Sequence, residues 1–156
     1  DSREQDPSLT DEERKQVEDM KNKLQSAKDS AQQQQENEQK KSERRQEFSS
    51  EMDELESDDL KISSAANAED ELAMTASSFE QWDELLSEMY DYLAGVLNAD
   101  QYASEEENYK QWVAERDSGA ENAASATEDS TQKQLASYSF KQSYTKARCY
   151  KLLDMM

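Results

Sequence analysis

Apolar side chains recur at helical spacing through the C-terminal two thirds of the chain. The strongest pattern covers 69–97, where the apolar stripe is wide enough to contact two neighbouring helices. Two further patterns cover 101–126 and 132–155, and the polar breaks at 98–100 and 127–131 supply residues that commonly cap helices. The spacing therefore predicts three amphipathic helices that pack on one another. The stripe of the first helix consists of Leu72, Phe79, Trp82, Leu86, Met89, Leu93 and Val96.

A weaker helical pattern precedes these three. Thr10, with Glu13 three residues later, is typical of a helix start. Apolar residues then step by three and four over 17–31, the same seam is polar over 34–45, and it becomes apolar again at Phe48. The pattern fits one long helix with a weak middle, or two helical segments that share a phase. Because the middle has almost nothing to bury, we favour a spacer that is helical only where it finds a partner.

The predicted architecture is all-α, a small antiparallel bundle of three to four helices over 47–156, preceded by a polar segment over 1–46. The chain has only two Gly and one Pro, and sheets and tight hairpins depend on these residues. Hydrophobic residues make up 33% and charged residues 35%, so part of the chain has too little to bury. We expect the polar segment to be partly helical or disordered, with disorder at 1–10.

The negative charge is concentrated in the predicted bundle. Of the formal net charge of −19, residues 1–46 carry −2, and residues 47–156, with 25 acidic and 8 basic side chains, carry −17. Such a domain repels nucleic acids and anionic membrane surfaces and attracts basic proteins at low salt. Generic solubility, or adaptation to a salty or acidic medium, would give the same charge.

The sequence carries no recognisable signature of a catalytic, cofactor or metal site, and its paired carboxylates occur in runs typical of a solvated helix face. It has no His, and its two glycines, Gly95 and Gly119, are too far apart for a phosphate-binding loop. The single Cys149 lies on an apolar helix face, which favours an inert core thiol. The acidic pattern that begins at 98–100 fails as a calcium loop, because Ala103 stands where a glycine is needed. We therefore predict a protein that is not an enzyme and that binds no cofactor or metal.

The segment 109–117 places an arginine where an apolar stripe would continue. On a helix Tyr109, Trp112 and Arg116 share one face, and Asp117 lies at its edge. In one interpretation Arg116 joins a buried hydrogen-bonded network with polar residues of the last helix. In the other, Trp112 belongs to the core, and the aliphatic part of the Arg116 side chain extends beside it so that the guanidinium reaches solvent. The predicted members of the network are Trp82, Tyr90, Trp112, Arg116, Asp117, Thr145 and Arg148.

Three motifs, taken together and in order, resemble the lysozyme-inhibitor LprI-type family. They are WDELLSEMY at 82–90, WVAERD at 112–117 and TKARCY at 145–150, and the resemblance covers roughly 75–156. The chain departs from the family at Ser87, where Asn is usual, and at Ala120, where many members have a second cysteine, so the family disulfide is absent. The other departures are Val113 in place of Ile, and Glu128, Asp129 and Ser130 in place of a Gly-Gly turn.

The resemblance implies an all-helical, extracytoplasmic domain, often carried on a lipoprotein, that binds and inhibits lysozyme. The charge agrees with a basic partner of that kind, a cell-wall hydrolase, and segment 1–46 would serve as a tether to a membrane anchor. The chain has no apolar run of membrane-spanning length and no signal peptide, and it begins at Asp1 without Met, which favours a mature or trimmed protein. The candidate partner-binding residues combine aromatic anchors with an acidic run: Tyr92, Tyr102, Glu105, Glu106 and Glu107.

A second hypothesis rests on the N-terminal heptad seam. A structural protein of the cell envelope could use the seam over 17–60 to associate with a second copy of itself. An enzyme, as a third hypothesis, has no supporting residue in the sequence.

Overall fold

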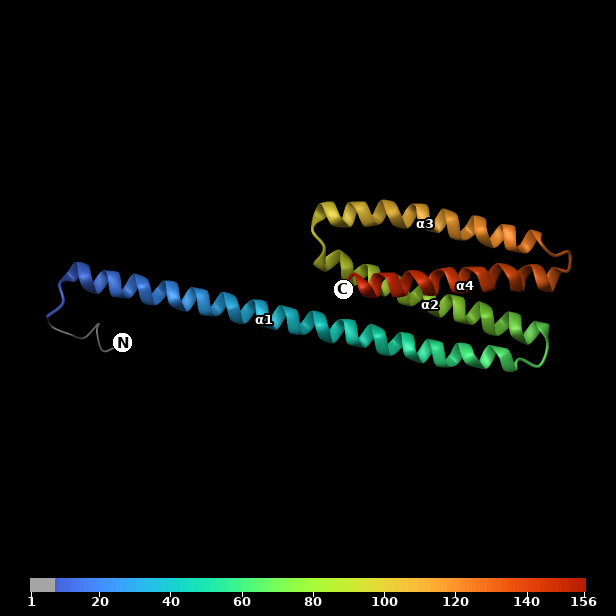
Figure 1. Cartoon of the computed structure of the whole chain (residues 1–156), viewed down its shortest axis with the longest axis horizontal. Coiled ribbons are helices and arrows are strands. Elements are labelled where there is room, and N and C mark those ends of the chain that lie inside the picture. Colours follow the sequence, from blue (N-terminus) through green and yellow to red (C-terminus); the bar gives the residue numbers. More distant parts are fainter. Residues whose placement is uncertain (1–7) are drawn as a thin grey trace. The chain divides into compact units, whose positions relative to one another are not determined.

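The computed structural model describes residues 8–156, and its architecture is all-α, as predicted (Figure 1). Of the segment 1–10, for which we expected disorder, residues 1–7 lie outside the described part. In residues 8–156 we find no strand, and none of the helices there is long and apolar enough to cross a membrane. The elements in chain order are α1 (Asp11–Asp59), the short 3₁₀ helix η2 (Leu60–Ser64), α2 (Ala68–Val96), α3 (Ala99–Ser125) and α4 (Ser130–Asp154).

The helix α1 is continuous through its polar middle, as in the first of the two alternatives, and not helical only where it finds a partner, as we favoured. It begins after Thr10, whose Oγ1 accepts a hydrogen bond of 3.2 Å from the backbone N–H of Glu13. Almost every side chain over 11–44 is exposed. Amide side chains support this stretch through bonds to residues four positions on, such as the 3.1 Å bond from Gln33 to Asn37. Each such pair contributes only about 0.2–0.5 kcal/mol, so helix propensity and the absence of Gly and Pro also matter.

The chain divides into two compact units, Asp1–Arg44 and Arg45–Met156. In the second unit α4 packs along both α2 and α3, and Figure 1 shows successive helices running in opposite directions. The C-terminal end of α1 completes this bundle, with the ring of Phe48 edge-on to Tyr92 at a centroid distance of 5.9 Å. The buried apolar core consists of Phe48, Met52, Trp82, Leu85, Leu86, Met89, Leu93, Trp112, Cys149, Leu152 and Leu153.

Short polar side chains cap the helices of the second unit near the predicted breaks. Asn67 accepts a bond from the backbone of α2, and Asp129 does the same for α4. Asn98 and Gln101 form a reciprocal capping box at the start of α3, with bonds of 2.8 and 3.1 Å. These local contacts satisfy backbone groups that a helix start leaves unpaired, which explains why the boundaries lie within two residues of the predicted ones.

The docking of α1 on the bundle can be tested at Phe48, whose side chain is fully buried. We expect Phe48→Ala to lower the free energy of unfolding by about 3–5 kcal/mol, because it leaves a cavity between α1 and α2. Met20→Ala, at a position that is 65% exposed on the same helix, is the control and should change it by less than about 0.5 kcal/mol. Equal urea midpoints for the two variants would contradict this packing.

Candidate functional site

A buried ionic cluster joins three helices of the bundle. Arg148 of α4 donates from Nε to the hydroxyl of Tyr90 on α2 at 2.9 Å, and from Nη2 to Oε1 of Glu105 on α3 at 2.5 Å. The Tyr90 hydroxyl donates in turn to the same Glu105 oxygen at 3.1 Å. The side chains of Arg148 and Glu105 are only 7% and 10% exposed. We call these three residues the Arg148 cluster, and its charges are paired where little water reaches them.

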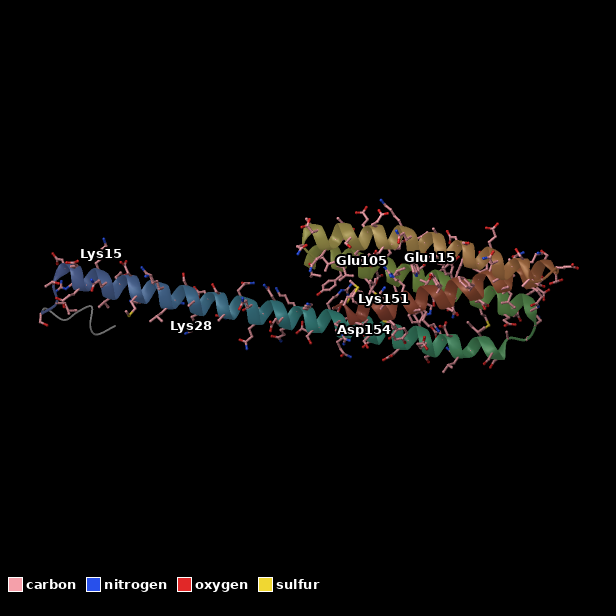
Figure 2. All side chains as sticks on the ribbon, turned by 45° about the horizontal axis from the view of Figure 1, so that its top comes forward. Lys15, Lys28, Glu105, Glu115, Lys151 and Asp154 are labelled. Atoms are coloured by element: carbon pink, nitrogen blue, oxygen red, sulfur yellow. The ribbon has the colours of Figure 1, made fainter. Side chains whose placement is uncertain are left out.

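The burial of Glu105 corrects one sequence-based interpretation. We predicted that Glu105, Glu106 and Glu107 form a solvated run that includes partner-binding carboxylates, but Glu105 faces the interior while Glu106 and Glu107 are exposed. Glu105 lies seven residues before Trp112, so it shares the buried face of α3. That spacing was the feature of the sequence from which the burial of Glu105 could have been predicted. Figure 2 shows Glu105 on α3.

Burial also affects the titration of the tyrosine in this cluster. Desolvation raises the pKa of Tyr90 to about 12, and the neighbouring Arg148 partly opposes that increase. Tyr90 therefore stays protonated at physiological pH and remains able to donate its hydrogen bond to Glu105.

Arg116 has ionic partners, but they are not the predicted polar residues of α4. Its Nη1 donates to Asp83 of α2 at 3.1 Å, and its Nε donates to Asp117 at 3.2 Å. The Arg116 side chain is 11% exposed, while Asp83 and Asp117 are 42% and 54% exposed. The guanidinium lies 5.3 Å from the ring centroid of Phe79 and 5.1 Å from that of Trp112. The guanidinium thus lies against aromatic rings, and its charge is paired with carboxylates that are partly exposed to solvent.

Trp82 belongs to a second cluster, centred on a carboxylate that the sequence analysis missed. Asp59, the last residue of α1, accepts a hydrogen bond from the indole Nε1 of Trp82 at 2.9 Å and pairs with Nζ of Lys146 at 2.8 Å. Ser78 donates to the other Asp59 oxygen and accepts from the amide of Gln142 at 3.0 Å. The only sequence signal was that Asp59 follows the apolar stripe of α1 by one helical turn.

Two further α4 residues of interest lie in the core. Thr145, predicted as a network member, is fully buried, and its hydroxyl has no hydrogen-bond partner in the described part of the chain. Cys149 is fully buried, and burial raises its pKa to about 12, so the thiol is not poised as a nucleophile. Across residues 8–156 no three His, Cys, Asp or Glu side chains converge as metal ligands would.

Tyr90, one member of the Arg148 cluster, also lines a cleft between α2 and α3. The tyrosine cleft, as we call it, has a volume of about 270 Å³. Tyr102 and Glu106, both predicted for partner binding, lie in it, whereas Tyr92 packs against Phe48 and Glu107 is exposed outside it. Its lining residues are Ser87, Tyr90, Asp91, Tyr102, Glu106 and Tyr109.

A comparison with known protein families identifies the bundle. The family model described as Lysozyme inhibitor LprI matches residues 62–152, more than half of the chain. The chain belongs to the LprI family. This confirms the resemblance drawn from the three motifs, and the matched range includes both the Arg148 cluster and the tyrosine cleft. No curated protein and no solved structure matches the chain.

The two arginines of this LprI-family bundle should differ in their effect on stability. Arg148→Ala leaves a buried carboxylate without its partner, so we expect a loss of about 3–5 kcal/mol in the free energy of unfolding. Arg116→Ala should cost less, about 1–2 kcal/mol, because its partners are half-exposed and ring contacts make up the rest.

A triple variant, Arg148→Met with Glu105→Leu and Tyr90→Phe, is the control, because it removes the whole polar cluster and leaves no orphaned charge. It should recover most of the stability that Arg148→Ala loses. Denaturant unfolding of Arg148→Ala, Arg116→Ala and the triple variant measures these free energies of unfolding. Equal losses for the two alanine variants would contradict the difference in burial between the partners of Arg148 and Arg116.

Proposed function

We propose that this LprI-family domain is a non-enzymatic binding module that inhibits a basic cell-wall hydrolase such as lysozyme outside the cytoplasm. The family match is the observation that carries the proposal, because the family is described as lysozyme inhibitors. The charge of the bundle supports it. Residues 45–156 contain 25 acidic and 9 basic side chains, a formal net charge of −16, which is complementary to a strongly basic protein.

In this proposal the acidic exterior steers the hydrolase to the domain, and the rigid bundle then covers its substrate groove. Charge complementarity mainly raises the association rate, and salt screens it. The buried Arg148 cluster fixes three helices relative to one another, so little conformational freedom is lost when the partner binds. We further propose that domain 47–156 is held by segment 1–46 as a tether, with a lipid anchor upstream.

The proposal predicts salt-sensitive inhibition. The full chain should inhibit hydrolysis of a cell-wall suspension by animal-type lysozyme at about 0.01 M salt, where the Debye length is roughly 30 Å. At about 1 M salt, where that length is roughly 3 Å, association should be at least about tenfold slower. Lysozyme with acetylated lysines is the control and should bind more weakly at low salt. Unchanged lysozyme activity at low salt would refute the proposal.

One observation favours a second candidate function, self-association through α1. Met20 and Leu24 lie on the heptad seam and are 65% and 66% exposed. Residues 11–44 carry 9 acidic and 8 basic side chains, so their net charge of −1 does not oppose pairing with a second copy. In this candidate function the chain is a structural protein of the cell envelope.

Sedimentation of the full chain tests this candidate function. If the chain self-associates, its sedimenting mass should rise with protein concentration. The double variant Met20→Glu with Leu24→Glu should sediment as a monomer, because both new charges enter the seam. Asn22→Glu with Ser26→Glu adds the same charge at exposed positions outside the seam and should leave association intact. A wild-type chain that stays monomeric at every concentration would end this candidate function.

A further inference from the structure

We propose that the tyrosine cleft is a socket for one lysine or arginine side chain of the basic partner. This inference rests on the proposed function for the identity of the partner, and it adds the contact point and its chemistry. The cleft is formed by one face of each of two helices, with Tyr90 and Asp91 from α2, and Tyr102, Glu106 and Tyr109 from α3.

The size of the cleft suits a single side chain. Its volume of about 270 Å³ lies below the roughly 300–1,000 Å³ typical of sites for free small molecules. A protruding side chain of a protein partner needs less room, because the rest of the partner stays outside. The anchor residues of protein interfaces commonly fill pockets in this way.

The chemistry of the lining favours a cation. Aromatic faces attract an ammonium or guanidinium group that comes within roughly 6 Å of the ring centroid, and three tyrosines line the cleft. Asp91 and Glu106 add two exposed carboxylates, and within residues 8–156 neither is paired with a basic side chain. Arg148, which reaches the Tyr90 hydroxyl, does not line the cleft, and Glu105 balances its charge, so it does not repel an incoming cation.

The walls of the cleft are held in place before any partner arrives. The Tyr90 hydroxyl is fixed by its bonds with Arg148 and Glu105. The Tyr90 ring meets Tyr109 edge-on at a centroid distance of 4.9 Å, and Tyr109 stacks on Trp112 at 5.8 Å. Because these rings are fixed by buried neighbours, a bound cation orders little of the protein, which favours affinity.

A second cleft of about 410 Å³, between α3 and α4, is a poorer candidate. It is lined by Lys151 and Arg148 as well as by Glu115 and Tyr144. Lys151 of α4 and Glu115 of α3, both labelled in Figure 2, line this cleft together. The Lys151 ammonium would repel a basic side chain, and the one carboxylate there already accepts a 2.9 Å hydrogen bond from Tyr144.

The first experiment tests the socket without any hydrolase. The full chain is titrated with Nα-acetyl-lysine amide, Nα-acetyl-arginine amide and the neutral isostere Nα-acetyl-norleucine amide, and NMR chemical shifts are followed. The two cationic probes should shift resonances of Asp91, Tyr102 and Tyr109, and norleucine should not. Equal shifts with norleucine, or shifts spread over other acidic faces, would overturn the proposal.

The second experiment measures lysozyme binding by isosteric variants. Asp91→Asn with Glu106→Gln removes the two carboxylates of the cleft. Glu80→Gln with Glu121→Gln removes two exposed carboxylates from the same helices, about 16 and 22 Å farther along them. The cleft variant should bind at least about tenfold more weakly than the control, chiefly through faster dissociation that persists at high salt. Equal affinities would overturn the proposal.

The two experiments separate the socket from the proposed function. If lysozyme does not bind the wild-type chain, the proposed function fails, and the amide probes still decide whether the cleft selects cations. If lysozyme binds and the cleft variant matches its control, the socket fails while the function stands. Thermal unfolding of both variants shows that they remain folded.

Discussion

Arg148 and Glu105 carry opposite charges into the interior of the bundle, and neither charge could remain there alone. Removing an ion of this size from water costs several kcal/mol even after relaxation, so each group requires the other at hydrogen-bond distance. The two residues belong to α4 and α3, and Tyr90 adds α2 to the same cluster. The requirement therefore fixes the rotation and register of three helices at once, more strictly than apolar packing alone would.

The same pairing separates the interior charges from the exterior ones. Inside, Arg148 is balanced by Glu105, and Lys146 is shared by Asp59 and Glu56 at the end of α1. The remaining acidic side chains outnumber the basic ones and lie mostly exposed along the helices. The domain thus combines an ion-paired, specific interior with a strongly negative surface. These properties suit a rigid protein that meets a basic partner.

The tyrosine cleft lies where these two regions meet. Tyr90 takes part in the buried cluster through its hydroxyl and lines the cleft as well. Asp91, its neighbour in sequence, is exposed at the same place. The rigidity of the core is therefore transmitted directly to the candidate contact surface, which is the arrangement expected of a preformed binding site.

The amino-acid sequence alone indicated the three C-terminal helices, their breaks and the family, but it left open whether α1 is continuous. Helical periodicity and capping are local properties that residues such as Asn98 and Gln101 express within one turn. It did not determine which charged side chains are buried. Glu105, Glu106 and Glu107 are chemically identical, and only the rotation of α3 against α4 brings the first of them to Arg148. Asp59 and Trp82 meet for the same reason, because the contact joins residues that local pattern cannot relate.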